Sequence, residues 1–364
     1  MSHQLFARAR VSAGIALTMA TALVSAGCAA PSTATTAPTA PSPTTSTSSP
    51  TAKRAALYVV SHLTGGDRLE GKYGPDLGQT SDVALGLAGT PGQSATLAKV
   101  MTYLDAHAAT YVHGDPSSGE KVGAHYAGST GKLALVAKVT GRNPSSFGGL
   151  DLISELRGLM NSDGRFRDDS KFGDFSNPLG QAFDILALQR GTSDGAPRAA
   201  IDNLLTAQCA DGGFADAFPK AGATCSPTPD ATGLALQALV AARADCPATK
   251  ARSWLKAHQR ADGSFGDSAA DPSKPGVGNV NSTAYAANGL KATGQSTSKV
   301  VDYLGSVQNP DGGLPIKPGD SDKKSNVYAT AQALGAFAGS SLLTIGPSPI
   351  APRALACPQT ATGT

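Results

Sequence analysis

The sequence has few aromatic residues, little net charge and no cysteine pattern typical of a structural metal site. Aromatic residues make up 5% of the 364 positions, and Trp254 is the single tryptophan. Lysine and arginine number 30 against 27 aspartates and glutamates, and Arg8 and Arg10 lie in an N-terminal leader. The remaining chain is nearly neutral, which argues against a nucleic-acid partner because such partners require concentrated positive charge. No CxxC pair occurs, and we therefore predict no metal ligands.

The N-terminus has the organisation of an export signal. Arg8 and Arg10 precede an uncharged, apolar run over residues 11–27, which is short for a membrane span. The run ends in Ala26-Gly27-Cys28, and a cysteine directly after small residues resembles the bacterial lipobox. We expect residues 1–27 to be a lipoprotein signal peptide and Cys28 to be lipidated. Lipidation would anchor the protein to the outer face of the bacterial cytoplasmic membrane, and plain secretion is the alternative.

The segment that follows Cys28 contains nothing that could build a core. Residues 29–52 are exclusively alanine, proline, serine and threonine. Such a composition cannot offset the entropy of ordering, so residues 28–53 are expected to form an extended, mobile tether. The folded domain is predicted over residues 54–340, with residues 341–364 as a C-terminal tail. No segment after the leader is long and apolar enough to cross a membrane.

Four cysteines remain after Cys28. An even number in an exported chain suggests two disulfides, although four cysteines allow three connectivities. We favour Cys209–Cys225, because these residues bracket a single loop. Cys246–Cys357 would then attach the C-terminal tail to the domain.

A short turn recurs four times at a nearly constant interval. Each copy is an Asp-Gly pair with Phe or Leu two positions after the glycine, and the aspartates are Asp163, Asp211, Asp262 and Asp311. Their spacings of 48, 51 and 49 residues indicate stacked copies of one supersecondary unit. Glycine supplies the positive φ that ends a helix, and aspartate bonds to nearby backbone. We therefore assign the four aspartates a structural role.

Each turn lies between two helices of different character. The residues before it are amphipathic, as at Ile201, Leu204 and Leu205, and should form an outer helix with one solvent face. The residues after the next loop, such as 231–239 and 326–334, are small and apolar nearly all round, which predicts an inner helix packed on several sides. Counting backwards gives about six pairs, enough for a closed ring. The second copy has no recognisable Asp-Gly turn.

In such a ring, the inner helices would all begin at one mouth. Helix N-termini there gather partial positive charge and unpaired N–H groups. Alignment of the inner helices places good N-cap residues at equivalent positions: Ser129, Asn177, Asp230, Asn281 and Ser325. Capping explains them without a ligand, yet the caps would also surround the mouth. The candidate ligand-binding residues are Asn177, Asp230, Asn281, Tyr285, Asn326 and Tyr328.

The turn and its flanking helices resemble the α/α-toroid superfamily. The pattern Gln208-x-x-Asp211-Gly212-Gly213-Phe214 matches best, and those beginning at Gln259 and Gln308 are similar. The superfamily holds terpene (squalene-type) cyclases, protein prenyltransferase β-subunits, the helical domain of cobalamin carriers and exported bacterial proteins with prenyltransferase/squalene-oxidase-type repeats. The resemblance implies an all-α fold, an α6/α6 toroid of about six outer and inner helix pairs. It does not distinguish an enzyme from a carrier.

Most residues that the superfamily's enzymes use are absent from this sequence. Cyclases that protonate an alkene resemble one another in an Asp-x-Asp-Asp-Thr run, which residues 228–232 match only at Asp230. The low aromatic content disfavours a cavity that shields carbocations. Prenyltransferases share a zinc site of Asp, Cys and His. The histidines after the leader do not reproduce that site: His62, His107, His113, His125 and His258.

We therefore expect a monomeric, lipid-anchored protein that binds a small or amphiphilic ligand at the mouth. The likeness to cobalamin carriers makes a corrin one candidate ligand, although those carriers also use a second domain, and no cofactor is predicted. One alternative is an enzyme acting on an isoprenoid or a polysaccharide, with Asp230 as its best catalytic candidate. Another is a protein-interaction module of the cell envelope.

Overall fold

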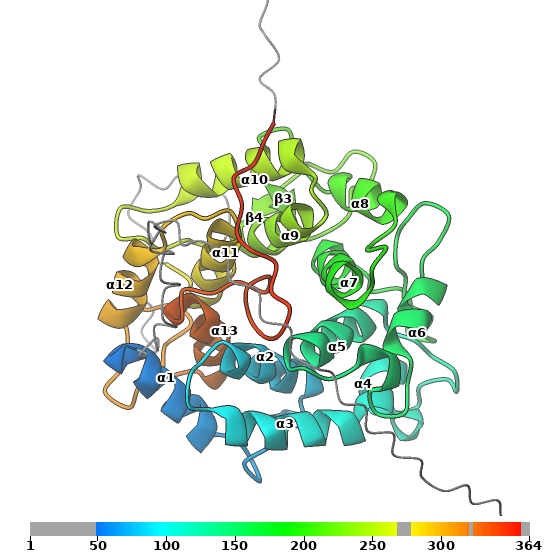
Figure 1. Cartoon of the computed structure of the whole chain (residues 1–364), viewed down its shortest axis with the longest axis horizontal. Coiled ribbons are helices and arrows are strands. Elements are labelled where there is room, and N and C mark those ends of the chain that lie inside the picture. Colours follow the sequence, from blue (N-terminus) through cyan, green and yellow to red (C-terminus); the bar gives the residue numbers. More distant parts are fainter. Residues whose placement is uncertain (1–48, 268–277, 320–322, 358–364) are drawn as a thin grey trace, which may run out of the picture. The chain divides into compact units, whose positions relative to one another are not determined.

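In the part of the chain that the structure describes, six inner helices enclose the centre of the domain and seven outer helices surround them (Figure 1). The computed structural model describes residues 49–267, 278–319 and 323–357. The predicted leader, Cys28 and nearly all of the predicted tether lie outside these residues. The inner helices are α2 (Leu77–Ala88), α5 (Ala127–Val139), α7 (Pro178–Gly191), α9 (Pro229–Ala241), α11 (Val280–Ala292) and α13 (Val327–Phe337). The outer helices are α1 (Pro50–Ser61), α3 (Ser94–Ala106), α4 (Ala108–His113), α6 (Leu152–Gly158), α8 (Arg198–Leu205), α10 (Asp245–His258) and α12 (Ser298–Ser306).

The remaining elements are short and lie between the helices. Two 3₁₀ turns occur, η1 (Pro116–Ser118) and η2 (Pro144–Ser146). In one antiparallel hairpin β1 (Glu70–Gly71) pairs with β2 (Gly74–Pro75), so that Glu70 faces Pro75. In the other, β3 (Phe214–Ala215) pairs with β4 (Pro227–Thr228), with Phe214 opposite Thr228. The described part of the chain is therefore all-α in class, as predicted.

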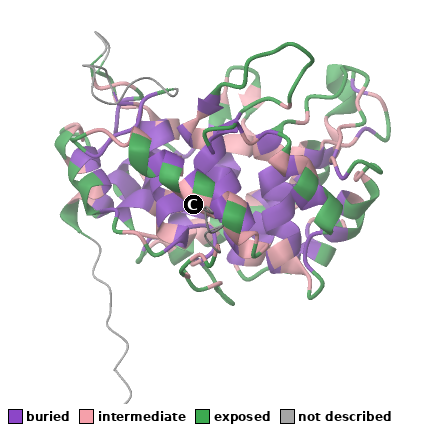
Figure 2. Cartoon of the chain, turned by 90° about the horizontal axis from the view of Figure 1, so that it is seen from above, coloured by how far each residue is buried: buried purple, intermediate pink, exposed green. Residues whose placement is uncertain are grey.

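The inner helices are parallel and contact one another in the order α2, α5, α7, α9, α11, α13 and back to α2. Parallel packing follows from contacts at matching heights, such as that between Gly128 and Gly180 in the first turns of α5 and α7. Helices α9 and α11 approach backbone to backbone, because a Cβ at Gly289 would lie 2.6 Å from the Gly233 carbonyl oxygen. Small residues thus allow the inner helices to pack on several sides, and Figure 2 shows that buried residues fill the middle of the molecule.

The repeated Asp-Gly turns have the structural role that was predicted. Each aspartate accepts a hydrogen bond from the backbone N–H two residues later. The following Phe or Leu is buried, and its N–H donates to a side chain in the first turn of the next inner helix, as from Phe214 to Thr232 (2.8 Å). The glycines have positive φ and contact the next outer helix; a Cβ at Gly212 would lie 2.9 Å from the Lys250 carbonyl oxygen. The turn therefore joins three helices.

Helix α1 closes the ring by serving as the next outer helix for the last repeat. A Cβ at Gly312 would lie 2.6 Å from the Arg54 carbonyl oxygen, as a Cβ at Gly263 would lie 2.3 Å from the Lys299 carbonyl oxygen one repeat earlier. The Gln308 side chain donates to the Thr51 carbonyl oxygen (3.0 Å). Helix α1 begins at Pro50, so residues 50–53 belong to the folded domain and the predicted boundary at residue 54 is corrected. The composition of residues 50–53 predicts a tether, because composition does not report the tertiary contacts that make these residues helical.

The C-terminal segment is also corrected, because much of it is built into the domain. Leu342, Leu343 and Ile345 are buried at the end of the ring where the inner helices finish. The Gln237 side chain accepts a hydrogen bond from the Leu342 N–H (2.8 Å), and the Arg190 guanidinium donates to the Ile345 carbonyl oxygen (2.9 Å). We call residues 340–345 the closing segment. In Figure 1 it forms the orange-red loop at the centre.

Both predicted disulfides are confirmed. Cys209–Cys225 closes the loop between α8 and α9, and Cys246–Cys357 joins α10 to the chain beyond the closing segment. Arg353 strengthens the second attachment through an ion pair with Asp245. Two disulfides indicate folding in an oxidising compartment, which is consistent with export. Within the described ranges no helix has the length and apolar character that a membrane span needs.

Candidate functional site

The six inner helices begin at one end of the ring, which we call the mouth, and side chains satisfy many of their first N–H groups. Five extended residues cap these helices: Asp76, Asn177, Thr228, Asn279 and Asn326. In α5 the first N–H, that of Ala127, donates instead to the Asp168 carboxylate from a later loop (2.8 Å). Burial raises the pKa of the Asp168 carboxyl, although the hydrogen bonds from the backbone N–H groups of Ala127 and Phe175 oppose the shift.

Of the five predicted caps, Asn177 is confirmed and four are wrong. Ser129, Asp230 and Asn281 lie within the first turns of α5, α9 and α11, and Ser325 precedes the true cap, Asn326. In α9, Pro229 occupies the first helical position, where its missing N–H costs nothing, and this shifts the cap to Thr228. Asn177 and Asn326 use their side-chain oxygens for capping and do not join the residues described next.

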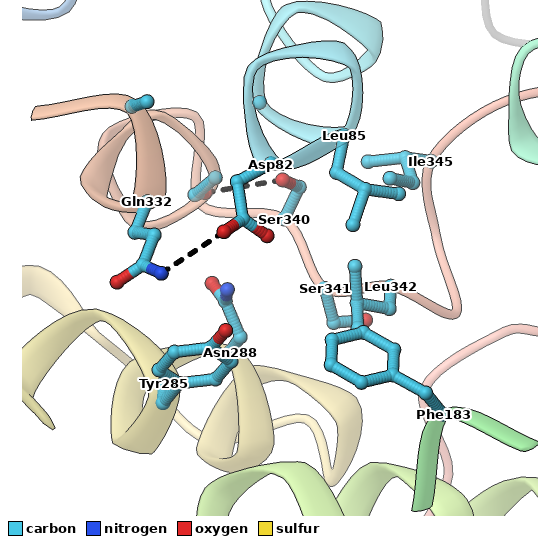
Figure 3. Close-up of a pocket in the computed structure, with 13 residues that line it drawn as sticks. Asp82, Leu85, Phe183, Tyr285, Asn288, Gln332, Ser340, Ser341, Leu342 and Ile345 are labelled. Atoms are coloured by element: carbon cyan, nitrogen blue, oxygen red, sulfur yellow. Dashed lines mark hydrogen bonds between the residues drawn. The ribbon is translucent and has the colours of Figure 1, made fainter. Parts of the chain in front are cut away.

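Polar contacts link neighbouring inner helices around the space that they enclose, which we call the bore. The Ser282 hydroxyl donates to Asp230 (2.7 Å), and the Asn281 amide donates to Gln332. The Gln332 amide in turn donates to Asp82 (3.1 Å, Figure 3). Lys132 forms an ion pair with Asp82 from the opposite side (2.6 Å). Polar groups from α2, α5, α11 and α13 are therefore connected in one row, the polar network of the bore, and the Asp230–Ser282 pair lies beside it.

The ion pair at the centre of this network is largely shielded from solvent. The side chains of Lys132 and Asp82 are 12% and 6% exposed. Lys132 also donates to the Gly78 carbonyl oxygen (3.0 Å) and lies over the Phe183 ring. Burial lowers the pKa of Lys132, but the Asp82 carboxylate together with Tyr111 and Asp76 outweighs this effect, and the net shift is upward. The two charges neutralise each other, so this pair supplies strong hydrogen-bonding groups without net charge.

Asp230 and Tyr285 flank the network and have shifted acidities. Burial raises the pKa of Asp230, while the hydrogen bond from Ser282 works in the opposite direction. Burial also raises the pKa of Tyr285 well above its ordinary value, and the nearby Asp82 and Asp230 carboxylates add to the shift. Asp230 is thus a carboxyl that can be held protonated more readily than one in water, which is the property a proton donor needs.

Below the polar network lies a small cavity, whose far end is covered by the closing segment. Asp82, Tyr285 and Gln332 line one end, and Leu342 and Ile345 line the other (Figure 3). The space open to the centres of water molecules is about 40 Å³, enough for a few ordered waters. The amide oxygen of Asn288 is buried there without a hydrogen-bond partner. A drug-sized ligand needs about 300–1,000 Å³, so this cavity is too small to hold one.

Exposed apolar side chains lie in the loops that lead into four of the six inner helices, α2, α5, α7 and α13. The structure describes six large hydrophobic residues that are exposed, and all except Leu57 lie in the loops that lead into inner helices. These five, which we call the rim, are Tyr73, Val122, Phe172, Phe175 and Ile316. Two of their aromatic rings carry a lysine ammonium about 5 Å from the ring centre, Lys72 at Tyr73 and Lys171 at Phe172. The rim thus combines apolar surface with positive charge.

The structure brings together some of the predicted site residues. Asp230, Asn281 and Tyr285 lie at the polar network, whereas the Tyr328 hydroxyl donates to the Glu70 carbonyl oxygen (2.9 Å) and links α13 to β1. Sequence reasoning missed Asp82 and Lys132. Each lies six residues after the N-cap of its helix. The signal that could have identified them was a charged residue within an inner helix that is otherwise small and apolar.

The architecture matches solved structures. Type II terpene cyclase MstE from Scytonema aligns with a TM-score of 0.56 at 15% identity, covering 79% of this chain and 96% of that chain. A wild-type glycosidase gives a TM-score of 0.53 at 13% identity, with 80% and 96% covered. An unsaturated glucuronyl hydrolase specific for heparin gives 0.52 at 14%, with 79% and 95% covered. No protein-family model and no curated protein sequence matches the chain.

These similarities establish the class of fold. The protein is an α/α-toroid, as the sequence resemblance implied. Sequence identities of 13–15% relate the chain to these enzymes by fold alone, because one fold supports unrelated activities. Function must therefore be argued from the bore and the mouth.

Proposed function

We propose that this protein is exported, is tethered through Cys28 to the outer face of the bacterial cytoplasmic membrane, and binds a small amphiphilic ligand at the mouth of the toroid as a monomer. The observation that carries the proposal is the polar network of the bore beneath a rim of exposed apolar side chains. A ligand with a polar group and an apolar body would satisfy both surfaces at once.

The polar part of the site favours a hydrogen-bonding group over a strongly charged one. The Asp82–Lys132 pair is internally neutralised, and the amides of Asn281 and Gln332 supply both donors and acceptors. Inner-helix N-termini add a modest preference for partial negative charge at the mouth. Hydroxyl, amide and ether groups fit this environment, whereas a bare multivalent anion would lack a dedicated cation.

The apolar part of the site explains why the ligand should be amphiphilic. Phe172 and Phe175 are 53% and 61% exposed, and Tyr73 is 91% exposed. Covering such side chains contributes roughly 25 cal/mol for each Å² removed from water. A corrin remains one candidate of this type, and it would lie at the mouth because the cavity below the network is too small.

An enzyme is the second candidate, because Asp230 lies at the polar network with a raised pKa. Its substrate would be an isoprenoid or a polysaccharide at the mouth, and Asp230 would donate the proton. Asp230→Asn should then abolish turnover of such a substrate while leaving its binding intact. Turnover that survives this change would remove Asp230 from the mechanism. A protein-interaction role at the envelope is the reading that remains if neither ligand nor turnover is found.

The test of ligand binding has two parts. Native mass spectrometry of the tag-free chain, purified from its own host, should reveal a retained small molecule. A thermal-shift panel of isoprenoids, glycans and corrins should then identify the class that raises the unfolding midpoint. An empty protein with no shift across the panel would contradict the proposal.

Matched variants separate the mouth from the rest of the surface. The rim variant Phe172→Ser/Phe175→Ser should weaken binding at least tenfold and leave stability almost unchanged, because both side chains are exposed. Leu57→Ser is the control, since Leu57 is similarly exposed (52%) but lies on α1. Equal affinities for the rim variant and the control would move the binding site away from the mouth.

A further inference from the structure

Three of the five described histidines share one structural role. His107 and His258 each stack on the aromatic ring four residues earlier in an outer helix, and His62 packs against Tyr58 in a tilted arrangement. The Nδ1 atom of each lies 2.8 Å from the carbonyl oxygen of that same residue. These contacts account for the three histidines as parts of the outer wall. His113 and His125 do not follow this pattern.

The other two histidines meet at one carboxylate. His113 ends α4, His125 lies just before α5, and Glu155 lies in α6. The Nε2 atom of His113 is 2.9 Å from Oε2 of Glu155, and Nδ1 of His125 is 3.8 Å from the same oxygen. The three candidate ligand atoms all lie within 4.8 Å of one another. The Nδ1 atom of His125 is buried and has no hydrogen-bond partner, although it lies near Oε2 of Glu155. This nitrogen is therefore available to bind a metal ion.

These distances suit a metal ion bound by two nitrogens and one oxygen. Zinc–nitrogen and zinc–oxygen bonds of about 2.0–2.2 Å in a tetrahedron place neighbouring ligand atoms about 3.3–3.6 Å apart. The observed separations from Glu155, 2.9 and 3.8 Å, lie on either side of this range. The three side chains are 22–31% exposed, which leaves an entry path and a fourth position open to solvent.

The location of the group supplies an independent reason for it. In the other five repeats, a backbone N–H after the turn donates to the fourth residue after the cap of the next inner helix: Thr80, Gln181, Thr232, Thr283 and Thr330. The second repeat has no Asp-Gly turn, and within the described residues no backbone N–H donates to the equivalent Thr130. His113, His125 and Glu155 lie at this connection and link it to α6, the next outer helix.

We propose that His113, His125 and Glu155 bind a divalent transition-metal ion, with zinc as the cation that best suits the set, and that this ion fastens the second repeat to α6 in place of the missing turn. Imidazole and carboxylate ligands fit zinc, and three protein ligands leave one position for water. The site lies in the wall of the toroid and is independent of the ligand proposed for the mouth. Binding should weaken in acid, because protons compete for the same nitrogens.

The test measures metal content directly. The tag-free mature chain is stripped with EDTA, dialysed against Zn²⁺ and analysed by elemental mass spectrometry. Wild type should retain about one zinc per chain, whereas His113→Gln and Glu155→Gln should lose at least nine-tenths of it. His107→Gln and His258→Gln are the matched controls and should retain the wild-type amount. Co²⁺ in place of Zn²⁺ should give the visible absorption of a tetrahedral site in wild type and the controls only.

Stability gives a second readout that does not depend on enzyme activity. Zn²⁺ should raise the unfolding midpoint of wild type and both controls but not that of Glu155→Gln. If His113→Gln fails to fold, the nearly isosteric Glu155→Gln decides, with its helix content checked by circular dichroism. The proposal is overturned if wild type retains no more zinc than Glu155→Gln, or if the control variants lose zinc to the same extent.

Discussion

Removing one partner of the Asp82–Lys132 pair should destabilise the toroid strongly. In Lys132→Met the Asp82 carboxylate, 6% exposed, would keep a hydrogen bond from Gln332 but no positive charge. Breaking a buried ion pair in this way costs about 3–5 kcal/mol, because the remaining charge is left without compensation. That loss is a large part of the roughly 5–15 kcal/mol that a folded protein has in total.

Removing both partners should cost much less than removing one. Asp82→Leu/Lys132→Met replaces the pair by apolar side chains, and such replacements are often close to neutral. The double-mutant cycle should therefore give a coupling energy above about 2 kcal/mol. Because the folded pKa of Lys132 is raised, its contribution is fully present below the unfolded value of about 10.4 and is lost as pH rises through the folded value.

The assay is urea unfolding followed by far-UV circular dichroism, with both disulfides intact and metal content held constant. Wild type, the two single variants and the double variant are compared at pH 7 and again above pH 10. A cost below about 1 kcal/mol for Lys132→Met would refute the reasoning, because that is the value of a solvated surface pair. It would mean that water reaches the centre of the bore.

Three further predictions concern stability. Removing the Cys246–Cys357 bridge, whose cysteines are 111 residues apart, should lower the free energy of unfolding by about 2–4 kcal/mol in urea and speed proteolysis of the C-terminal segment. Burial alone would raise the pKa of Glu120, but hydrogen bonds from Ser170 and Tyr126 lower it to about 2. Its contribution is thus present above about pH 4.3 and lost towards pH 2, and Glu120→Gln should flatten that part of the pH–stability curve. Burial raises the pKa of Asp184 well above its ordinary value, with Asp168 adding to it, so stability should fall as pH rises above about 4. Asp184→Asn should remove that fall, and an unchanged pH profile would show that Asp184 is paired in solution.

Local signals in the sequence were sufficient for the repeating unit. The Asp-Gly turn at Asp211, the amphipathic stripe at Ile201 and Leu204, and the small-residue inner helices each depend on neighbouring residues. The Cys209–Cys225 pairing also followed from a short separation. These features predicted the toroid and its disulfides because each repeat carries the same local information.

Features that depend on distant contacts were not predictable in the same way. Pro50 lies in a segment with the composition of a tether, and it begins a helix only because α1 packs against the last repeat. The sequence alone assigns Leu342 and Ile345 to the C-terminal tail. Only their hydrogen bonds with Arg190 and Gln237, which are distant in sequence, place them in the folded domain. His113 and Glu155 are 42 residues apart, so no spacing pattern could have joined them.

The way in which α1 completes the last repeat also determines when folding can finish. The Gln308 side chain contacts Thr51 across 257 residues, so the closing contact is among the longest in the chain. A chain that crosses a membrane N-terminus first must wait for its last repeat before α1 finds its partner. Until then both ends of the helix array are open and apolar. Under the proposed export, folding would therefore finish only after the last repeat has crossed the membrane, and a chain truncated before Gly312 would leave α1 without its position in the ring.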